Sequence, residues 1–331
     1  MSPAHSPIDF ADVAAARERL RDHLPVSPAM SYPLLDALVG HGIRVWVKHE
    51  NHLPVNTFKV RNGTSALTAL LARDEQAARR GVAAATTGNH GQGLAWAGAR
   101  LGIPVTICVP LGNNPDKNAS IRSYGARLIE HGAAYDDAIA ACDALVDHEG
   151  LTRIHSTNNA DVLAGAGTLT AEFLEQVPDL DAVVLALGGG SQCVGAITVR
   201  DAVRPSMAVY AVQSDGATAQ YDGWRDGKPR SGQSVRTFAE GIATGATYEM
   251  TRDALRSGLA DFVLVSDHAI AQAVRELLRV THNLVEGSGA AGLAGLQQMA
   301  PRLTGKTVGI VLSGGNLDAA RLQIILAGGT P

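Results

Sequence analysis

Short apolar runs, each followed by a turn and then a helical stretch, recur along the chain and constrain its fold more than any other feature. They predict strands at residues 43–47, 81–85, 105–109, 182–187, 209–213, 262–265 and 308–312, and helices at 92–100, 117–124 and 193–203. Several runs are apolar along their whole length, which is typical of strands in a parallel sheet covered by helices on each side. The sequence therefore predicts an α/β fold. The polar, turn-rich segment 215–245 is expected to be a long loop near a site or an interface.

Composition and charge exclude several classes of protein. The chain has 331 residues, enough for two domains, and 46% of them are apolar, so it can bury a full core. Its net charge is −4 without any basic block, which argues against nucleic acid or a membrane surface as a partner. Neither a signal peptide nor a membrane-spanning apolar run is evident, and the three cysteines form no CxxC pair. These features predict a soluble protein of the cytoplasm.

One lysine stands where it could act as a nucleophile. Lys59 follows Phe58 and precedes a helical stretch at 65–73, so it is expected where a turn enters a helix. In a partly apolar pocket the charged form of a lysine is disfavoured, which lowers its pKa and frees the amine to react. The same position also suits an ordinary lysine whose charge reaches water, and taken alone it favours that interpretation.

Two glycine-containing turns between a predicted strand and a predicted helix could bind anions. The turn Thr86-Thr87-Gly88-Asn89-His90-Gly91-Gln92-Gly93 suits a carboxylate, or it could simply cap the helix. The turn Gly188-Gly189-Gly190-Ser191 has a side-chain-free backbone that could wrap a phosphate. A dinucleotide is disfavoured there because the third fingerprint position is Cys193 and the next strand closes on Gln213 rather than an acidic residue. An ATP loop is disfavoured because Gly-Lys-Ser/Thr is missing.

Other signals are weaker. A small polar turn, Ser313-Gly314-Gly315-Asn316, follows the last predicted strand, and Glu286-Gly287-Ser288-Gly289 separates two apolar helical stretches. The 11 histidines contain no HxxxH or HxH pair, so we expect no metal site. The Gly-x-Ser-x-Gly elbow of many hydrolases is absent.

The order and spacing of these motifs resemble those of fold-type II pyridoxal-phosphate enzymes, above all the threonine/serine dehydratase and serine racemase family. The resemblance covers roughly residues 25–320. It implies two domains, each an open, mostly parallel sheet flanked by helices, with the active site in the cleft between them. The large cofactor-binding domain would comprise residues 1–65 and 156–331, and a small mobile domain residues 66–155. It further implies pyridoxal 5′-phosphate as cofactor, an amino acid as substrate and a homodimer.

The resemblance also implies a role for each site residue. Lys59 would hold the cofactor as a Schiff base, and Phe58 would pack against its ring. The cofactor would also contact Asn89 at the ring hydroxyl, Gly188, Gly189, Gly190 and Ser191 at the phosphate, Ser313 at the pyridine nitrogen, and Gly241 and Glu286 near the ring or substrate. The substrate carboxylate would be surrounded by Thr86, Thr87, Gly88, Asn89 and His90.

The reaction implied by the resemblance is β-elimination from a β-hydroxy-α-amino acid such as threonine or serine, which yields a 2-oxo acid and ammonia. Lys59 would remove the α-proton while the cofactor delocalises the resulting charge. A hydroxyl at Ser313, unlike a carboxylate, does not hold the pyridine nitrogen protonated, which favours elimination over transamination.

Departures from the family pattern leave alternatives open. Asn62 replaces a glycine, Ser191 replaces the fourth glycine of the phosphate loop, and Gln213 and Ala219 stand where some members have acidic metal ligands. Thr87 takes the place of a racemase serine that acts as a second acid/base, so Thr87 is a second catalytic candidate and racemisation remains an alternative. Asn62 and Asn158-Asn159 suggest a bulkier substrate of the 3-hydroxyaspartate or phenylserine type. Further alternatives are β-replacement, as in cysteine synthase, and a non-catalytic ligand sensor, although a sensor has no need of Lys59.

Overall fold

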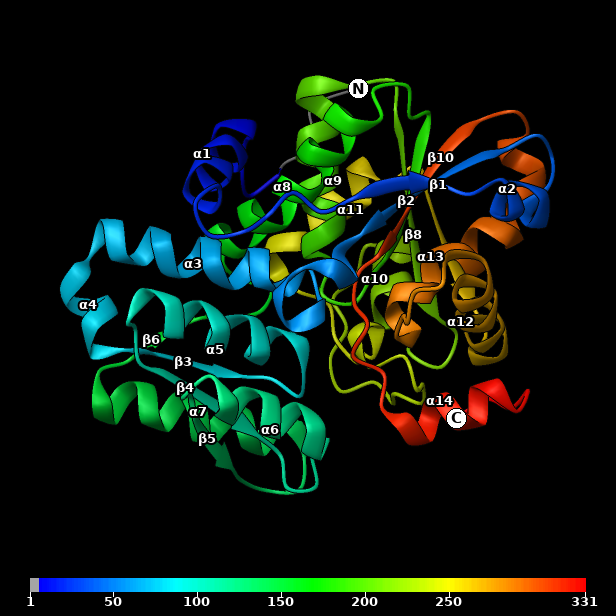
Figure 1. Ribbon diagram of the computed structural model, residues 1–331. Coiled ribbons are helices and arrows are strands. Elements are labelled where there is room, and N and C mark those ends of the chain that lie inside the picture. The colour runs from blue at the N-terminus through cyan, green and yellow to red at the C-terminus, as the bar shows by residue number, and fades with distance from the viewer. Residues whose placement is uncertain (1–5) are drawn as a thin grey trace.

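The larger of two sheets organises most of the chain. The computed structural model describes residues 6–331 and contains two separate sheets (Figure 1). The larger sheet has six strands in the order β1-β2-β10-β7-β8-β9, and only β1 is antiparallel to its neighbour. Its strands are β1 (Ala29–Ser31), β2 (Arg44–His49), β7 (Ala182–Ala186), β8 (Ala208–Ser214), β9 (Asp261–Val265) and β10 (Thr307–Leu312).

The smaller sheet is built from one continuous stretch of the chain. Its four strands are all parallel and lie in the order β5-β4-β3-β6. They are β3 (Val82–Ala85), β4 (Val105–Val109), β5 (Arg127–Glu130) and β6 (Thr152–Arg153). In Figure 1 this sheet occupies the lower left with α4–α7 around it, while the larger sheet occupies the right.

Helices connect the strands of both sheets. Those that enclose the smaller sheet or lead into it are α3 (Lys59–Arg73), α4 (Glu75–Arg80), α5 (Asn89–Leu101), α6 (Pro115–Ser123) and α7 (Tyr135–Glu149). The others are α1 (Phe10–Leu20), α2 (Pro33–Val39), α8 (Ala160–Gln176), α9 (Ser191–Val203), α10 (Ala219–Asp226), α11 (Glu249–Gly258), α12 (Asp267–Thr281), α13 (Gly287–Met299) and α14 (Ala319–Leu326). Short 3-10 turns are η1 (Glu50–His52), η2 (Pro54–Asn56), η3 (Glu240–Ile242) and η4 (Ala300–Leu303).

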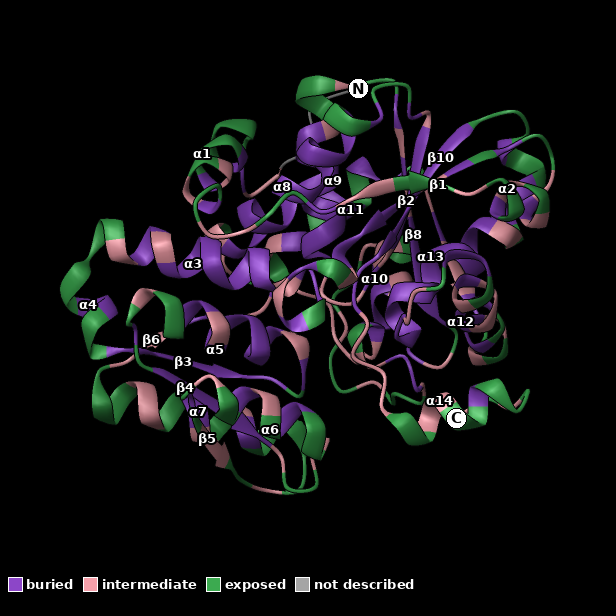
Figure 2. Ribbon diagram, in the orientation of Figure 1, coloured by how far each residue is buried: buried purple, intermediate pink, exposed green. Residues whose placement is uncertain are grey.

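Both faces of the larger sheet are buried, as the strand pattern predicts. Alternate residues of β7 point to opposite faces, so Val184 joins a core with α12 and α13 while Val183 and Leu185 join one with α8 and α9. The strands of this sheet are accordingly buried along most of their length (Figure 2). The smaller sheet follows the same plan, with α5 on one face and α7 on the other.

The predicted α/β fold is confirmed, and the predicted strands and most predicted helices are present with small shifts at their ends. The helix predicted at 65–73 begins six residues earlier, at Lys59. The segment 286–289, expected to separate two helices, instead caps and opens α13, so that expectation was wrong. The strands that the sequence pattern missed are β1, β5 and β6, which have only three, four and two residues. Runs that short carry too few apolar positions to show an alternation.

The segment 215–245 is only partly the loop that we expected. It contains the helix α10 and the turn η3, so the prediction of an irregular segment was wrong for those residues. Tyr221 and Trp224 lie three residues apart on one face of α10 and pack against Phe262 of β9. That spacing was the available signal for a helix, but Gly223 and the polar neighbours obscured it. Across residues 6–331, we find no helix of the length and apolarity needed to cross a membrane.

Candidate active site

Lys59 is the first residue of α3, and the turn before it is tied to the turn after β10. Thr57 forms an isolated bridge with Gly314, and the amide of Phe58 donates a hydrogen bond to the carbonyl of Ser313 (3.0 Å). Val55 and Asn56 both have positive φ angles, 55° and 53°, which is costly for a β-branched valine. The strained turn is held in place by these contacts, which bring the predicted residue Ser313 beside Lys59.

The surroundings of Lys59 favour its neutral amine. Burial lowers the pKa of Lys59 from the ordinary 10.5 to about 8. Its Nζ lies 4.9 Å from the centre of the Phe58 ring and 3.5 Å from Oγ of Ser191. No carboxylate forms a salt bridge with Lys59 among the described residues. The side chain is therefore suited to react as a nucleophile and to accept a proton.

Two glycines allow α3 and α5 to cross in close contact. A Cβ on Gly93 would lie 2.6 Å from the carbonyl oxygen of Lys59, and one on Gly63 would lie 2.8 Å from the backbone of Gly93. Such distances are too short for any side chain, so both positions require glycine. This crossing places the turn that begins α5 directly against Lys59.

The turn between β3 and α5 presents an uncapped helix end to the same space. Gly88 is the N-cap of α5 and has no side chain to satisfy the first helical amides, while Thr86 Oγ1 accepts only the amide of Gly88 (3.3 Å). Such amides and the helix dipole suit a carboxylate. His90 Nε2 lies 3.4 Å from the carbonyl of Ile154, and burial lowers the pKa of His90 to about 3, so this imidazole is neutral.

A hydrogen-bonded chain links this turn to the opposite side of the site. Asn89 Nδ2 donates to Glu286 Oε1 (2.6 Å), and Ser288 Oγ donates to the same oxygen (3.0 Å). The side-chain oxygen of Asn89, Oδ1, accepts a hydrogen bond from Asn316 Nδ2 (2.9 Å). Asn89 thus joins its own turn to two segments far away in the sequence, residues 286–288 and Asn316.

The glycine turn between β7 and α9 fits a phosphate. Gly190 has φ = 100° and forms the N-cap of α9, so the first amides of this helix also lack a side-chain cap. The carbonyl groups of the turn are already engaged, since Gln220 Nε2 donates to Gly188 (3.1 Å) and Thr251 Oγ1 donates to Gly189 (3.0 Å). Gln192 Nε2, which is buried at the cavity wall, has no partner within residues 6–331. Free donors therefore gather where an anion would lie.

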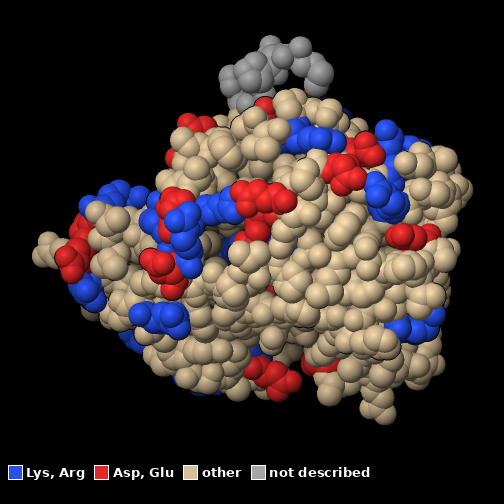
Figure 3. Space-filling model, turned by 45° about the horizontal axis from the view of Figure 1, so that its top comes forward, with Lys and Arg blue, Asp and Glu red and all other residues tan. Residues whose placement is uncertain are grey.

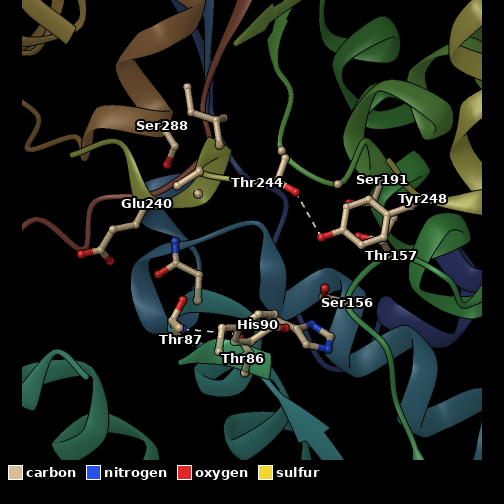
Figure 4. A pocket seen from close by; sticks show the side chains of 18 of the residues that line it. Thr86, Thr87, His90, Ser156, Thr157, Ser191, Glu240, Thr244, Tyr248 and Ser288 are labelled. Carbon is tan, nitrogen blue, oxygen red and sulfur yellow. Dashed lines mark hydrogen bonds between the residues drawn. The ribbon is translucent and has the colours of Figure 1, made fainter. Parts of the chain in front are cut away.

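One cavity of about 900 Å³ joins these features. Figure 4 shows Thr86, Thr87 and His90 on one side of it and Glu240 and Ser288 on the other. The cavity is lined by every residue that the sequence analysis assigned to the site, namely Phe58, Lys59, Thr86, Thr87, Gly88, Asn89, His90, Gly188, Gly189, Gly190, Ser191, Gly241, Glu286 and Ser313. The structure thus brings all of them together.

Sequence reasoning missed several residues of the cavity wall. They include Lys117, Tyr135, Arg153, His155, Thr157 and Tyr248. Arg153 and His155 lie at the carboxyl end of β6, where ligands of parallel sheets gather. Because β6 has only two residues, this strand end was not recognisable in the sequence.

Three asparagines taken as signs of a bulkier substrate are not part of the cavity wall. Asn62 is fully buried beside Ser191, Asn158 accepts a hydrogen bond from the amide of Met250, and Asn159 caps α8. Their positions therefore give no support to the expectation of a bulkier substrate.

Within the described residues, no group of three or more His, Cys, Asp or Glu side chains could hold a metal ion. Gln213, which stands where an acidic ligand was considered, instead accepts the amide of Tyr221 through its side-chain oxygen (3.2 Å).

Lys59, the Gly188–Ser191 turn and the start of α5 therefore surround one space that suits a reactive amine, a phosphate and a carboxylate. The family model for pyridoxal-phosphate dependent enzymes matches residues 20–314, and the chain belongs to this family. Pyridoxal phosphate is accordingly its cofactor, and the residues around Lys59 and the Gly188–Ser191 turn fit that group.

Relatives with known names are similar to this chain along most of its length. L-threo-3-hydroxyaspartate ammonia-lyase of Pseudomonas sp is 31% identical over 319 residues, which cover 96% of this chain and 98% of the relative. L-threonine ammonia-lyase of Geobacter sulfurreducens is 33% identical over 289 residues, 87% of this chain and 71% of that one. Among solved structures, maize serine racemase superposes with a TM-score of 0.90 at 27% identity, covering 96% of this chain and 97% of the other.

Proposed function

We propose that the protein is an ammonia-lyase that removes water and then ammonia from a β-hydroxy-α-amino acid such as threonine or serine, leaving a 2-oxo acid. The observation that carries this proposal is the position of Lys59, whose pKa is lowered to about 8, between the uncapped end of α5 and the glycine turn before α9. Relatives named as threonine and hydroxyaspartate ammonia-lyases support the same type of reaction.

In this proposal the substrate carboxylate and the cofactor phosphate are bound by two different helix ends. The free amides of α5, together with Thr86 and Thr87, bind the substrate carboxylate, and the Gly188–Ser191 turn binds the cofactor phosphate. Asn89 is fixed by Glu286 and Asn316, and its amide group keeps one hydrogen for the ring hydroxyl. Ser313 supplies a hydroxyl, not a charge, at the ring nitrogen.

Proton transfer at the α-carbon is the task of Lys59. When bound, the cofactor withdraws electrons from the α-carbon and so makes its proton acidic. The lowered pKa of Lys59 leaves a large fraction of its amine neutral near pH 8, ready to accept that proton. The β-hydroxyl then leaves as water by taking a proton from the Lys59 ammonium, which restores the neutral amine. Hydrolysis of the released enamine gives the 2-oxo acid and ammonia.

A dicarboxylic substrate is a second candidate. Its support is the similarity to the Pseudomonas hydroxyaspartate enzyme along almost its whole length, together with Arg153, a cation in the cavity wall that is paired with Asp143. A guanidinium could bind a second carboxylate on the substrate. Replacing Arg153 with Met should then lower kcat/KM for L-threo-3-hydroxyaspartate at least about tenfold while sparing serine. An equal loss with both substrates would contradict this candidate.

The proposal is tested by the spectrum and the products of the purified protein. We expect visible absorption, and we expect borohydride reduction followed by peptide mapping to place the pyridoxyl label on Lys59. A panel of serine, threonine, 3-hydroxyaspartate and phenylserine is then assayed for 2-oxo acid and for inversion at the α-carbon, with Lys59→Ala as control. A protein that binds the cofactor but releases no 2-oxo acid from any of them would exclude the lyase. Inversion without release would favour the racemase.

We also infer a cytoplasmic homodimer that binds neither nucleic acid nor membrane. The three cysteines are unpaired, and basic and acidic side chains are interspersed on the face shown in Figure 3. Val26, Met30 and Leu34, near the edge strand β1, are large exposed apolar side chains that support a self-association surface. Light scattering of the purified protein tests the dimer, and a monomer at micromolar concentration would exclude it.

A further inference from the structure

Asn62 is a buried polar residue with no direct access to the cavity. It lies in the first turn of α3, three residues after Lys59, and its exposed fraction is 0%. Its Nδ2 donates a hydrogen bond to Oγ of Ser191 (3.4 Å), and its Oδ1 has no partner among the described residues. Burying an amide with one group unpaired costs free energy, so packing alone is a poor reason for this residue.

Ser191 receives hydrogen bonds from two directions. It is the first residue of α9, and its side chain is buried at the cavity wall. Its Oγ accepts from Nδ2 of Asn62 and also from Nζ of Lys59 at 3.5 Å. A serine hydroxyl has two acceptor positions and one donor hydrogen. Once Lys59 carries the cofactor its nitrogen is engaged there, so Asn62 is the donor that continues to hold an acceptor position of Ser191, and the hydroxyl hydrogen points away from Asn62.

Nothing in the described part of the chain accepts the hydroxyl hydrogen of Ser191. The hydrogen bonds of Ser191 Oγ are the two that it accepts, from Asn62 and from Lys59. The free amides at the start of α9 face the same cavity. The hydroxyl hydrogen and these amides therefore form one group of donors directed at an anion.

We propose that Asn62 is a positioning residue that sets the direction of the Ser191 hydroxyl, so that this hydroxyl donates to the cofactor phosphate. The proposal rests on the cofactor site described above. Asn62 acts through Ser191 without touching the cofactor. The opposite orientation of the Asn62 amide would present Oδ1 to Ser191, which would accept its hydrogen and remove the donor from the cavity.

The test compares two ligands that differ only in the phosphate. Cofactor-free protein is titrated with pyridoxal phosphate and, separately, with pyridoxal, and Kd is measured from the absorption change. Ser191→Ala should weaken pyridoxal phosphate about tenfold, as expected for one lost hydrogen bond to a charged group, and leave pyridoxal unchanged. Asn62→Ala should act in the same sense, and the double variant should bind no more weakly than Ser191→Ala alone, because both changes remove one interaction.

Asn62→Asp is the most specific variant because it keeps the shape of the side chain but reverses the direction of its hydrogen bond with Ser191. The carboxylate would accept the Ser191 hydrogen and add negative charge near the phosphate, so Kd for pyridoxal phosphate should rise more than with Asn62→Ala. Thr64→Val, which removes a buried hydroxyl of α3 that has no partner in the described part of the chain, is the matched control and should leave both Kd values unchanged. Circular dichroism of the cofactor-free variants checks folding, and Asn62→Ser replaces any variant that does not fold.

Three results would overturn the proposal. These are equal weakening of both ligands by Asn62→Ala, unchanged binding of pyridoxal phosphate by Ser191→Ala, and additive effects in the double variant. A wild-type protein that takes up no pyridoxal phosphate at all would contradict the cofactor assignment itself, so the two failures are distinguishable.

Discussion

At the scale of single residues, the chemistry of the site depends on how Lys59 is surrounded. An exposed lysine is almost entirely protonated at pH 7 and can neither attack a carbonyl group nor accept a proton. Burial changes this balance because the charged form loses its water, and the pKa of Lys59 falls to about 8. The nearby His90 is kept neutral by the same effect, so it adds no positive charge beside the amine.

The lowered pKa of Lys59 predicts how fast cofactor-free protein takes up pyridoxal phosphate. With a pKa of about 8, the neutral fraction rises from about a tenth at pH 7 to about a half at pH 8 and is nearly complete above about pH 9. We therefore expect the rate to rise about fivefold between pH 7 and pH 8 and then level off. Stopped-flow absorption measures it, with N-acetyl-lysine amide as the reference for the cofactor's own titration. A rate that continues to rise towards pH 10.5, as for the reference amine, would contradict the prediction.

At the scale of elements, the position of Lys59 depends on how α3 is held at both of its faces. On one face α3 crosses α5 at Gly63 and Gly93. On the other, Arg61 donates to Glu50 (2.7 Å) and to Glu172 of α8 (2.9 Å). Lys48 completes this buried group by donating to Glu172 (2.5 Å). The helix end that carries Lys59 is therefore fixed by backbone packing and by paired charges.

Gly93→Ala should separate α5 from α3. The added methyl group would lie 2.6 Å from the Lys59 carbonyl oxygen, a backbone atom that cannot move aside without moving the helix. We expect a loss of about 1–3 kcal/mol in the free energy of unfolding and a clear fall in cofactor affinity. Ala99→Ser, which adds one atom on the exposed side of α5, is the control and should change neither quantity. Urea unfolding and cofactor titration measure them. A Gly93→Ala protein that matches Ala99→Ser would show that the crossing tolerates a side chain.

Glu172→Gln should destabilise the protein far more than the same change three residues later in α8. Burial opposes the charge of Glu172, but Arg61 and Lys48 outweigh it and hold the pKa of this carboxyl below its ordinary value. Without the charge of Glu172, the buried cations Arg61 and Lys48 have too few carboxylates to pair with. We expect the free energy of unfolding to fall by about 3–5 kcal/mol. Glu175→Gln breaks an exposed pair with Arg17 and should cost less than about 1 kcal/mol. Urea unfolding of both variants checks the difference, and similar values would show that the buried group adds little.

At the scale of the whole molecule, we propose that residues 66–155 form a small domain that moves relative to the remainder. The support comes from α3, whose residues Ala66, Leu67 and Leu70 pack into the core of the smaller sheet, while Arg61 is anchored to the other part. Contacts across the cavity then set how the parts approach each other. Lys117 of α6 pairs with Glu240 of η3, and Glu240 also pairs with Arg321 of α14.

The Glu240 pairs predict a pH dependence of stability. Burial raises the pKa of this carboxyl, but Lys117 and Arg321 lower it by more, so the pKa in the folded protein lies below the ordinary 4.5. The stabilisation is therefore present above about pH 4.5 and is lost as the pH falls through the folded value. We expect Glu240→Gln to cost about 1 kcal/mol at pH 7 and progressively less below pH 4.5. Thermal unfolding across pH 3–7 measures this, with the exposed Glu249→Gln as control. A constant difference across that range would contradict an electrostatic origin.

Local patterns of residues were enough to predict the fold class and the main segments around the cavity. Strands apolar on both faces allow only a covered parallel sheet, and Lys59, the Thr86–Gly93 turn and the Gly188–Ser191 turn are recognisable because each lies next to one strand or helix. Each of these motifs is recognised from neighbouring residues alone, so its prediction does not depend on the order of the strands in the sheet.

Contacts between segments far apart in the chain could not be predicted in this way. Arg153 and His155 reach the cavity through a strand of two residues, and Asn62 meets Ser191 across two helices instead of facing the substrate. The lowered pKa of Lys59 could not be predicted from the sequence either, because desolvation depends on every atom packed around the amine. Burial and pairing are properties of the packed molecule, and no local pattern of residues encodes them.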